Sequence, residues 1–322
     1  MKNSNQEKYT LVGKRIFVAG HKGMVGSALI RALKGIECDI LTQNSNELDL
    51  KDTVKVDKWF KENKPDTVFL AAAKVGGILA NSTYPASFLY DNLAIQNSVI
   101  SASYNNNVKK LMFLGSSCIY PRNAEQPLKE SSLLTGELEP TNEAYAIAKI
   151  AGIKLCESYR KQYGVDYISV MPTNLYGPGD NFHPQNSHVV AALISKFYEA
   201  KQLNKDKLIL WGSGNPLREF MHVDDLASGL IFLMENYSEE QHINIGTGKE
   251  ISIKDFSNII KAISGWSGKI EFDTSYPDGM PRKVMDVSKI NKLGWTHKID
   301  LEQGLKDAYK WYVTNHNDVR IK

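Results

Sequence analysis

The sequence predicts an α/β fold in which a doubly wound parallel sheet is joined to a second, smaller α/β domain. Short apolar runs alternate with helix-length amphipathic segments through the first half of the chain, as expected for strands joined by crossover helices. A glycine-rich turn separates the first strand from the first helix. After about residue 180 the alternation loosens, and Pro and Gly clusters separate shorter elements. These observations predict one sheet with helices on both faces and a smaller unit after it.

Each element of the first unit has its own signal. Strands are expected at the apolar runs 15–20, 38–42, 67–73, 110–117 and 166–177. Between them lie segments with helical spacing, of which the longest are 86–106 and 144–164.

The domain prediction follows from this pattern. We place the first domain at residues 1–180 and the second at 181–322. A helix at 222–236 and a strand at 242–248 are expected to rejoin the first domain, from the region near 215–250.

Composition limits the class of protein. The chain has 322 residues, of which 42% are hydrophobic and 23% are charged, as in ordinary globular proteins. The net charge is +3 and the lysines are dispersed among acids, so nucleic acid and anionic membranes are poor partners. No apolar run approaches the roughly 18 residues that span a bilayer. The polar N-terminus lacks a secretion signal, and we therefore expect a cytoplasmic protein.

The cysteines agree with that compartment. Cys38, Cys118 and Cys156 are an odd number and lack the spacing of a metal site. This pattern favours a reducing compartment and predicts neither a disulfide framework nor a bound metal.

The glycine turn is the first candidate site. Gly20, Gly23 and Gly26 form a G-x-x-G-x-x-G pattern between a predicted strand and a predicted helix. Residues without side chains let the backbone approach a pyrophosphate, whose charge then lies at the positive end of the helix. An isolated match would equally fit a tight turn without a ligand, but the flanking strand and helix favour a dinucleotide-binding (Rossmann) fold.

The choice of cofactor rests on the end of the second strand. NAD-selective folds usually place an acid there, whereas NADP-selective folds offer a cation to the extra phosphate. Here the strand ends in LTQNSN, with neither. Lys22 is the nearest cation, and Asn44 and Ser45 can hydrogen-bond a phosphate, so NADP is favoured over NAD. The alternative for Lys22 is a solvated loop charge.

The catalytic candidates follow the fourth strand. Tyr145 and Lys149 are four residues apart and share one face of a helix. A nearby ammonium is expected to lower the pKa of the phenol, which is about 10 when unperturbed. Such pairs occur by chance in many helices, but this one comes after Ser116, Ser117 and Cys118 at a strand end, where open α/β sheets bind ligands. Ser116 and Tyr145 would together hold a carbonyl oxygen, which predicts a nicotinamide-dependent oxidoreductase.

These residues lie in segments that resemble the GDP-L-fucose synthase family of the extended short-chain dehydrogenases/reductases. The resemblance runs from about residue 14 to the C-terminus, and SSCIYP and NFHPQNSHVV are its most specific parts. It is carried by GHKGMVGSALIRAL, AAAKVGGILANSTYPASFLYDN, LGSSCIYP, EPTNEAYAIAKIAGIKLCESY, MPTNLYGPGDNFHPQNSHVV, WGSGNPLREFMHVDD and PDGMPRK.

The resemblance implies a reaction in two stages. C3 and C5 of a GDP-4-keto-6-deoxy-D-mannose are first inverted by residues that fall on Cys118 and His188. Hydride then passes from NADPH to C4 while Tyr145 protonates the oxygen, assisted by Ser116 and Lys149, which gives GDP-L-fucose. Without the family match, Cys118 would be taken as a small buried hydrophobe and His188 as a hydrogen-bonding residue at a helix start.

The resemblance also implies binding residues and a homodimer. Lys196 and Arg218 would neutralise the pyrophosphate, Trp211 would offer apolar surface, and Asp278 would bind hydroxyls or guanine donors. Otherwise Lys196 and Asp278 would be surface charges, and His183 and His222 are expected to be structural. The implied substrate contacts are Asn174, Lys196, Trp211, Arg218 and Asp278. The implied cofactor contacts are Gly20, His21, Lys22, Gly23, Met24, Val25, Gly26, Ala72, Leu114, Gly115, Ser117, Lys149, Pro172, Asn174, Leu175 and His188.

Two alternatives stay open at this point. A C4 reductase of a related substrate, such as a GDP-4-keto-heptose in capsule polysaccharide synthesis, would keep nearly every motif and need little epimerisation. A dinucleotide-binding module without catalysis, acting as a redox sensor or scaffold, is disfavoured by the intact Ser116, Tyr145 and Lys149. The chain also departs from the family pattern after the second strand, where QNSN replaces basic residues, which bears on the strength of NADPH preference.

Overall fold

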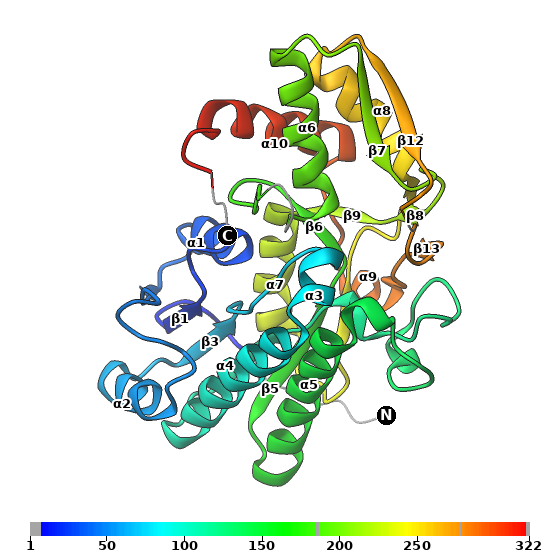
Figure 1. The fold of residues 1–322 in the computed structure, drawn as a ribbon. Helices are drawn as coiled ribbons and strands as arrows, with labels where there is room; N and C mark the ends of the chain where they lie inside the picture. Colours follow the sequence, from blue (N-terminus) through cyan, green and yellow to red (C-terminus); the bar gives the residue numbers. More distant parts are fainter. Residues whose placement is uncertain (1–7, 184–186, 277, 320–322) are drawn as a thin grey trace.

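The computed structural model describes residues 8–183, 187–276 and 278–319 (Figure 1). Its central sheet has six strands in the order β10-β5-β4-β3-β1-β2, and all neighbouring strands run parallel. Parallel neighbours and alternating helices confirm the doubly wound α/β fold. The six strands are β1 (Arg15–Ala19), β2 (Asp39–Leu41), β3 (Thr67–Leu70), β4 (Lys110–Leu114), β5 (Asp166–Pro172) and β10 (Ile243–Ile245).

Helices cover both faces of this sheet. Helices α2 (Thr53–Asn63), α4 (Pro85–Asn105) and α5 (Glu143–Tyr163) pack side by side in front of it, whereas α1 (Met24–Leu33) and α7 (Val223–Asn236) pack together behind it (Figure 1). Every residue of β3 and β4 is therefore buried, which explains why their sequences read as continuous apolar runs.

The last predicted strand of the first half is divided in two. The run expected at 166–177 forms β5 and then a separate strand, β6 (Asn174–Tyr176). The second strand leaves the main sheet and pairs in parallel with β9 (Phe220–His222). The chain is thereby directed from the large sheet toward the second group of elements.

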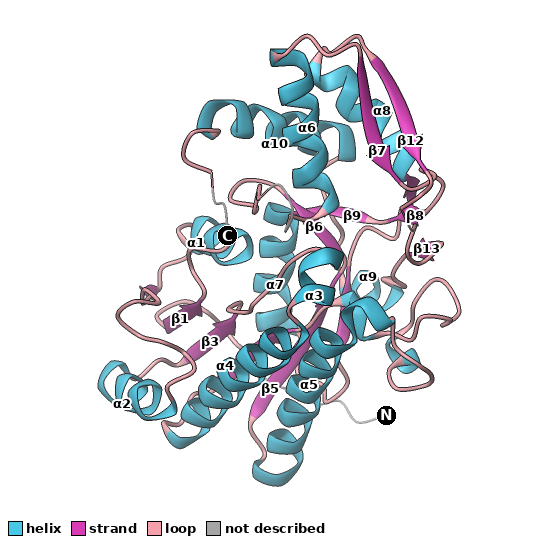
Figure 2. Ribbon diagram, viewed as in Figure 1, coloured by secondary structure: helices cyan, strands magenta, loops and turns pink. Residues whose placement is uncertain are grey.

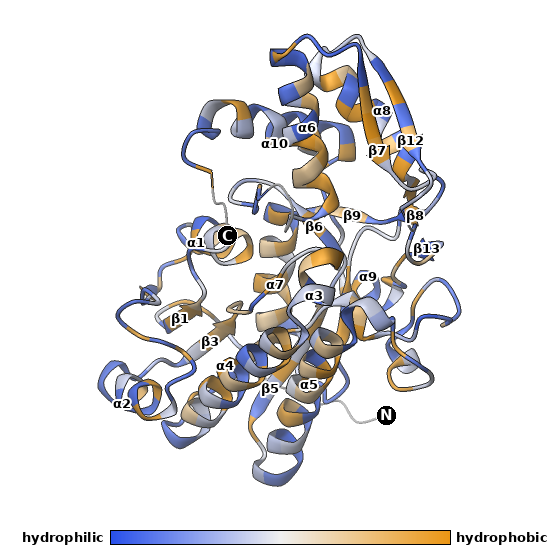
Figure 3. Cartoon of the chain, in the orientation of Figure 1, coloured by the Kyte–Doolittle hydropathy of each residue, from blue (hydrophilic) through white to orange (hydrophobic). Residues whose placement is uncertain are grey.

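A second group of elements lies at the top of Figure 1 and has its own apolar cluster. Strands β7 (Lys207–Trp211) and β12 (Lys269–Asp273) pair in parallel there, as Figure 2 shows by secondary structure. Three helices complete it: α6 (Val189–Gln202), α8 (Ile253–Ser264) and α10 (Leu301–Asn315). Figure 3 shows apolar residues along β7 and α6, consistent with the alternation of buried and exposed residues in β7.

The chain passes between the two groups more than once. After α6 and β7 it returns to the large sheet as α7 and β10, of which β10 pairs with β5 and α7 packs on α1. Short strands join the groups: β8 (Leu217–Arg218) pairs antiparallel with β11 (Ile251–Ser252) and parallel with β13 (Arg282–Lys283). The domain boundaries at 180 and 181 stay a prediction.

Shorter helical segments complete the fold. Helix α3 (Ile78–Thr83) contacts the 3-10 turn Pro140–Asn142 before α5, and α9 (Ser288–Leu293) lies beside β10. Two further 3-10 turns are Ser117–Ile119, after β4, and Glu130–Ser132. Across the part of the chain that the structure describes, every helix is too short or too polar to cross a lipid bilayer.

Candidate active site

The candidate site lies at the carboxyl ends of the parallel strands. A cavity of about 1160 Å³ opens there, and its wall includes residues of both groups of elements. The strand order reverses between β1 and β3, which is where open α/β sheets form a ligand crevice. The volume exceeds that of a typical site for one small ligand, so a cofactor and a substrate fit side by side. All the site residues predicted from the sequence line this cavity.

The glycine turn forms one end of the cavity and fits a dinucleotide. Gly20 has φ +87°, and a Cβ there would lie 2.7 Å from the Ala72 nitrogen. A Cβ on Gly26 would lie 2.1 Å from the Gly20 carbonyl oxygen, so neither position tolerates a side chain. Gly23 precedes α1 without a side-chain cap, which leaves the N-terminal turn of the helix for an anion.

The loop after β2 contains a carboxylate that sequence reasoning missed. Gln43, Asn44 and Ser45 line the cavity as expected. The amide nitrogens of Gln43 and Asn44 both donate to Glu47 Oε2, each at 3.1 Å. Glu47 itself is not among the described residues that line the cavity, whereas Lys22 lies exposed at the cavity wall.

The serine, tyrosine and lysine come together from two elements. Ser116 follows β4, while Tyr145 and Lys149 lie on α5. The Lys149 ammonium is 5.7 Å from the centre of the Tyr145 ring and donates to the Leu114 carbonyl oxygen at 2.8 Å. The Tyr145 ring packs edge-on against Phe88.

The expected lowering of the Tyr145 pKa was wrong: the net shift is upward. Burial raises the pKa of the Tyr145 phenol far above its ordinary value, the nearby Cys118 raises it further, and the Ser116 hydroxyl lowers it. Burial also lowers the pKa of Lys149 to about 8. The reason is that desolvation of the enclosed phenol dominates and that the ammonium is bonded to a backbone carbonyl. The ligand-free site thus holds a neutral phenol, the form that donates a proton.

Cys118 and His188 face the same cavity from opposite groups of elements. Cys118 is 8% exposed, in the 3-10 turn after β4, and its thiol pKa is raised by burial. His188 immediately precedes α6 and lines the cavity. Loss of solvation by the surrounding protein lowers the pKa of its imidazole, and so does the charge of Lys283. Near neutral pH the pair is therefore a thiol and a neutral imidazole, which together can donate one proton and accept another.

The substrate side of the cavity combines cations with aromatic rings. The Lys196 ammonium lies 5.1 Å from the centre of the Trp211 ring. The same ring stacks on Tyr276, with centroids 4.4 Å apart and planes at 6°. Both rings are partly exposed; Trp211 lines the cavity, and Tyr276, which was not predicted from the sequence, lies behind it.

The remaining predicted substrate residues are fixed by the protein. Arg218 donates to its neighbour's carbonyl at Leu217 and, at 3.4 Å, to the Asp278 carbonyl. The Asp278 carboxylate accepts from the backbone nitrogen and the hydroxyl of Ser213 at 2.6 and 2.7 Å, so it also anchors the loop after β7. Asn174 donates to the Glu219 carbonyl at 2.8 Å.

Lys283 is a further cavity residue that sequence reasoning did not single out. It lies in the quoted PDGMPRK segment, but its neighbours in space come from distant parts of the chain. Among the described residues no cluster of His, Cys, Asp and Glu side chains could hold a metal ion. Residues 184–186 and 277, which belong to two of the quoted segments, lie outside the described residues.

Comparison with known proteins agrees with this geometry. Residues 16–246 match the NAD dependent epimerase/dehydratase family. GDP-L-fucose synthase 1 of Arabidopsis thaliana is 55% identical over 303 residues, which cover 94% of this chain and 94% of that protein. A solved GDP-L-fucose synthetase from Naegleria fowleri bound to NADP has a TM-score of 0.91 at 31% identity, covering 98% of this chain and 99% of that one. A GDP-6-OMe-4-keto-L-xylo-heptose reductase from C. jejuni has a TM-score of 0.89 at 40% identity, covering 96% and 99%.

Proposed function

Because the chain belongs to the NAD dependent epimerase/dehydratase family, and within it to the GDP-L-fucose synthases, we propose that it converts GDP-4-keto-6-deoxy-D-mannose into GDP-L-fucose with NADPH. The observation that carries this proposal is that Cys118 and His188 line the same cavity as Ser116, Tyr145 and Lys149. A reductase alone needs only the last three. The additional thiol and imidazole are the kind of pair that moves protons on carbon.

Reduction uses the neutral phenol. NADPH supplies a hydride to C4 when bound. The Tyr145 hydroxyl donates its proton to the C4 oxygen, which becomes the product hydroxyl, and Ser116 stabilises the charge that develops on that oxygen. Lys149 lies beside the phenol with its ammonium directed to the Leu114 carbonyl, where it can also contact the nicotinamide ribose.

Epimerisation uses the same oxygen. C3 and C5 are both α to the C4 carbonyl, so removal of either proton gives an enolate whose charge lies on the oxygen beside Ser116 and Tyr145. Inversion requires one group to take the proton and another to return a proton to the opposite face. Cys118 and His188 together hold one proton near neutral pH, so they satisfy this requirement without a further group.

The cavity also supports recognition of the nucleotide. Arg218 and Lys196 supply the charge for a diphosphate, and the Trp211 ring, which stacks on Tyr276, supplies aromatic surface for guanine. The glycine turn and the N-terminus of α1 would hold the pyrophosphate of NADP, with Lys22, Asn44 and Ser45 near its 2′-phosphate.

We infer a C4 reductase of a GDP-4-keto-heptose as the second candidate. Its specific support is the likeness to the C. jejuni heptose reductase at 40% identity. Such an enzyme would use Ser116, Tyr145 and Lys149 in the same way, and a capsule polysaccharide would be the destination of its product. The two candidates differ in whether protons at C3 and C5 are exchanged.

The organisation of the protein is part of the same proposal. Residues 1–180 would bind the cofactor and residues 181–322 the GDP-sugar, with α7 and β10 returning to the first unit. We propose a cytoplasmic homodimer formed through α4 and α5, on which Tyr90 and Ile147 are exposed. The dispersed charge favours neither nucleic acid nor a membrane as a partner.

One experiment distinguishes the candidates. The protein is incubated with NADPH and GDP-4-keto-6-deoxy-D-mannose in deuterated water, NADPH absorbance is followed, and the product is analysed by NMR. NADPH oxidation with deuterium at C3 and C5 and GDP-L-fucose as product would support the proposed function. Oxidation without deuterium would leave a C4 reductase, and no oxidation, with turnover of a GDP-4-keto-heptose instead, would support the second candidate.

A further inference from the structure

Lys283 is a cation in the cavity wall that takes no part in the proposed reduction and epimerisation steps. It is the last residue of β13, and its partner in the parallel ladder with β8 is Arg218. Register partners on neighbouring strands project to the same side of a sheet. Both side chains line the cavity, so Lys283 extends the positive surface of Arg218 toward the catalytic groups.

The ammonium of Lys283 has no hydrogen-bond or ion-pair partner among the described residues. Within residues 8–183, 187–276 and 278–319 no group forms a hydrogen bond or an ion pair with its ammonium, and enclosure by the protein lowers its pKa. Arg282, the preceding residue, is exposed and paired with Glu250 at 2.7 Å. Lys283 is half-buried, and a cation in the wall of a cavity that lacks a partner among the described residues indicates a functional role.

The backbone around Lys283 is held on both sides. Before it, the Pro281 carbonyl accepts from the Leu217 nitrogen at 2.9 Å. After it, the Met285 nitrogen donates to the buried Glu219 carboxylate at 2.7 Å. Glu219 also accepts from the Gly248 nitrogen at 2.9 Å, so one carboxylate ties β13 to the loop after β10. The strand therefore presents Lys283 at a fixed place.

Lys283 lines the same cavity as the proton-transferring pair, Cys118 and His188. Its charge lowers the pKa of the Cys118 thiol and that of the His188 imidazole. Arg218 and Glu219 face it from β8 and the residue after it. Around Cys118, Ser116 and Lys149 also lower the thiol pKa, and burial acts against all three. Lys283 is the largest of the influences that favour the thiolate.

We propose that Lys283 is a positioning residue that sets the protonation states of Cys118 and His188 for the two carbon inversions. This inference rests on the proposed function. When one inversion moves a proton from carbon to the imidazole and another from sulfur to carbon, a thiolate and an imidazolium remain. An ammonium beside both offsets the thiolate charge until the imidazolium proton passes to the thiolate, directly or through water, which restores the thiol and the neutral imidazole for the second inversion.

The first test uses the ligand-free protein and needs no sugar. The rate of Cys118 alkylation by iodoacetamide is measured against pH by peptide-resolved mass spectrometry, with Cys38 as an internal reference. In parallel, His188 is titrated by NMR in protein labelled at histidine. Variants K283M and K283Q remove the charge, K283R keeps it, and R282M is the matched control on the same strand.

Removal of the cation is expected to raise both pKa values, because the protonated forms are no longer repelled or disfavoured by it. At a pH below the thiol pKa, K283M and K283Q should alkylate about tenfold more slowly at Cys118. K283R and R282M should stay within about twofold of wild type, and Cys38 should be unchanged in all of them. Unchanged titrations of Cys118 and His188 in both neutral variants would overturn the proposal, whatever sugar the protein uses.

The second test separates this proposal from the proposed function. K283M should slow deuterium exchange at C3 and C5 and move its pH profile upward, while hydride transfer to the already inverted GDP-4-keto-6-deoxy-L-galactose stays within a few-fold of wild type. Equal losses in exchange and hydride transfer would count against the assigned role. Shifted titrations in a protein that epimerises no GDP-sugar would instead contradict the proposed function and leave the electrostatic role of Lys283 standing.

Discussion

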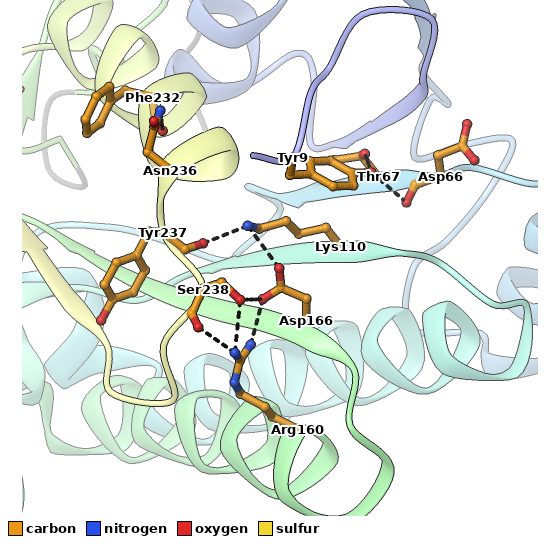
Figure 4. A network of polar contacts seen from close by, with 10 residues as sticks. All are labelled: Tyr9, Asp66, Thr67, Lys110, Arg160, Asp166, Phe232, Asn236, Tyr237 and Ser238. Atoms are coloured by element: carbon orange, nitrogen blue, oxygen red, sulfur yellow. Dashed lines mark hydrogen bonds and ion pairs between the residues drawn. The ribbon is translucent and has the colours of Figure 1, made fainter. Parts of the chain in front are cut away.

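The two ends of β4 differ in whether a buried lysine has a charged partner. At its first residue, Lys110 is 2% exposed and fully paired: its ammonium donates to the Tyr237 carbonyl at 2.7 Å and lies 3.0 Å from an Asp166 carboxylate oxygen (Figure 4). Asp166 is itself paired with Arg160 at 2.6 Å and accepts from Ser238 at 2.8 Å. At the other end, the buried Lys149 has only the Leu114 carbonyl as a hydrogen-bond partner among the described residues.

This difference teaches how to distinguish a structural charge from a functional one. Burial lowers the pKa of both lysines, but Asp166 raises that of Lys110 again, because the two charges favour each other. Lys149 has no carboxylate to do so within the described ranges, and its pKa is lowered to about 8. The paired Lys110 is therefore structural. The unpaired Lys149 faces the cavity, where a bound ligand would supply the missing partner.

The largest expected effect is on catalysis, at the end of β4 that faces the cavity (the cavity end). Replacing Tyr145 by Phe removes the proton donor but keeps the ring that packs on Phe88. We expect reduction of the C4 carbonyl to fall by about a thousandfold, within the range for loss of a general acid. NADPH oxidation by an already inverted GDP-4-keto sugar measures this step without epimerisation.

The control for this variant is binding and stability. NADPH affinity, followed by fluorescence titration, and the thermal midpoint should both stay near their wild-type values. A Tyr145→Phe protein that reduces the sugar at an unchanged rate would remove the phenol from the mechanism. The cavity end of β4 would then lose its contrast with the paired end.

The next effect concerns stability, at the end of β4 where Lys110 is paired (the paired end). Lys110→Met leaves the Tyr237 carbonyl without its donor and removes one partner of Asp166. Breaking a buried pair typically costs about 3–5 kcal/mol, and the Arg160 contact that remains on Asp166 suggests about 3 kcal/mol in the free energy of unfolding. Urea denaturation measures it. Turnover of the folded protein should be unchanged, and a large loss of turnover would mean that the two ends are coupled.

Lys149→Met should change stability in the opposite direction. The lysine pKa is about 8 in the folded protein and 10.5 in the reference state, so folding disfavours its charged form by on the order of 3 kcal/mol below pH 8. That cost is fully present below pH 8 and is lost as pH rises toward 10.5. The variant should therefore be more stable than wild type at pH 7, and this advantage should shrink by pH 10. A destabilised Lys149→Met at pH 7 would contradict the comparison.

Much of this molecule could be predicted from local sequence. The strands, the glycine turn and the placement of Ser116 before the Tyr145 helix follow from periodicity and spacing, because each signal spans few residues. The glycines were identifiable by their spacing, and the structure gives the reason for one of them, because a side chain at Gly26 would collide with the backbone of Gly20. The catalytic and binding roles of these residues stay predictions, although the cavity brings them all together.

What escaped prediction depends on contacts between distant segments. Lys283 became a site residue only through its register with Arg218, and Tyr276 adjoins the site only by stacking on Trp211. The pKa of Tyr145 was predicted in the wrong direction because desolvation depends on the whole enclosure and not on the lysine four residues away. Buried surroundings of this kind leave no signal in spacing.

The smallest expected effect tests whether the paired end acts as a unit. Ser238→Ala removes the hydroxyl that donates to Asp166 and accepts from Arg160 at 3.0 Å, while the ion pairs of Asp166 with Arg160 and Lys110 remain. We expect a loss of about 1 kcal/mol in unfolding free energy and no change in turnover. Combining it with Lys110→Met in a double-mutant cycle measures the coupling. If the serine variant alone cost as much as the lysine variant, the network would be stabilised cooperatively through its hydroxyl and not chiefly by pairing of the buried charge.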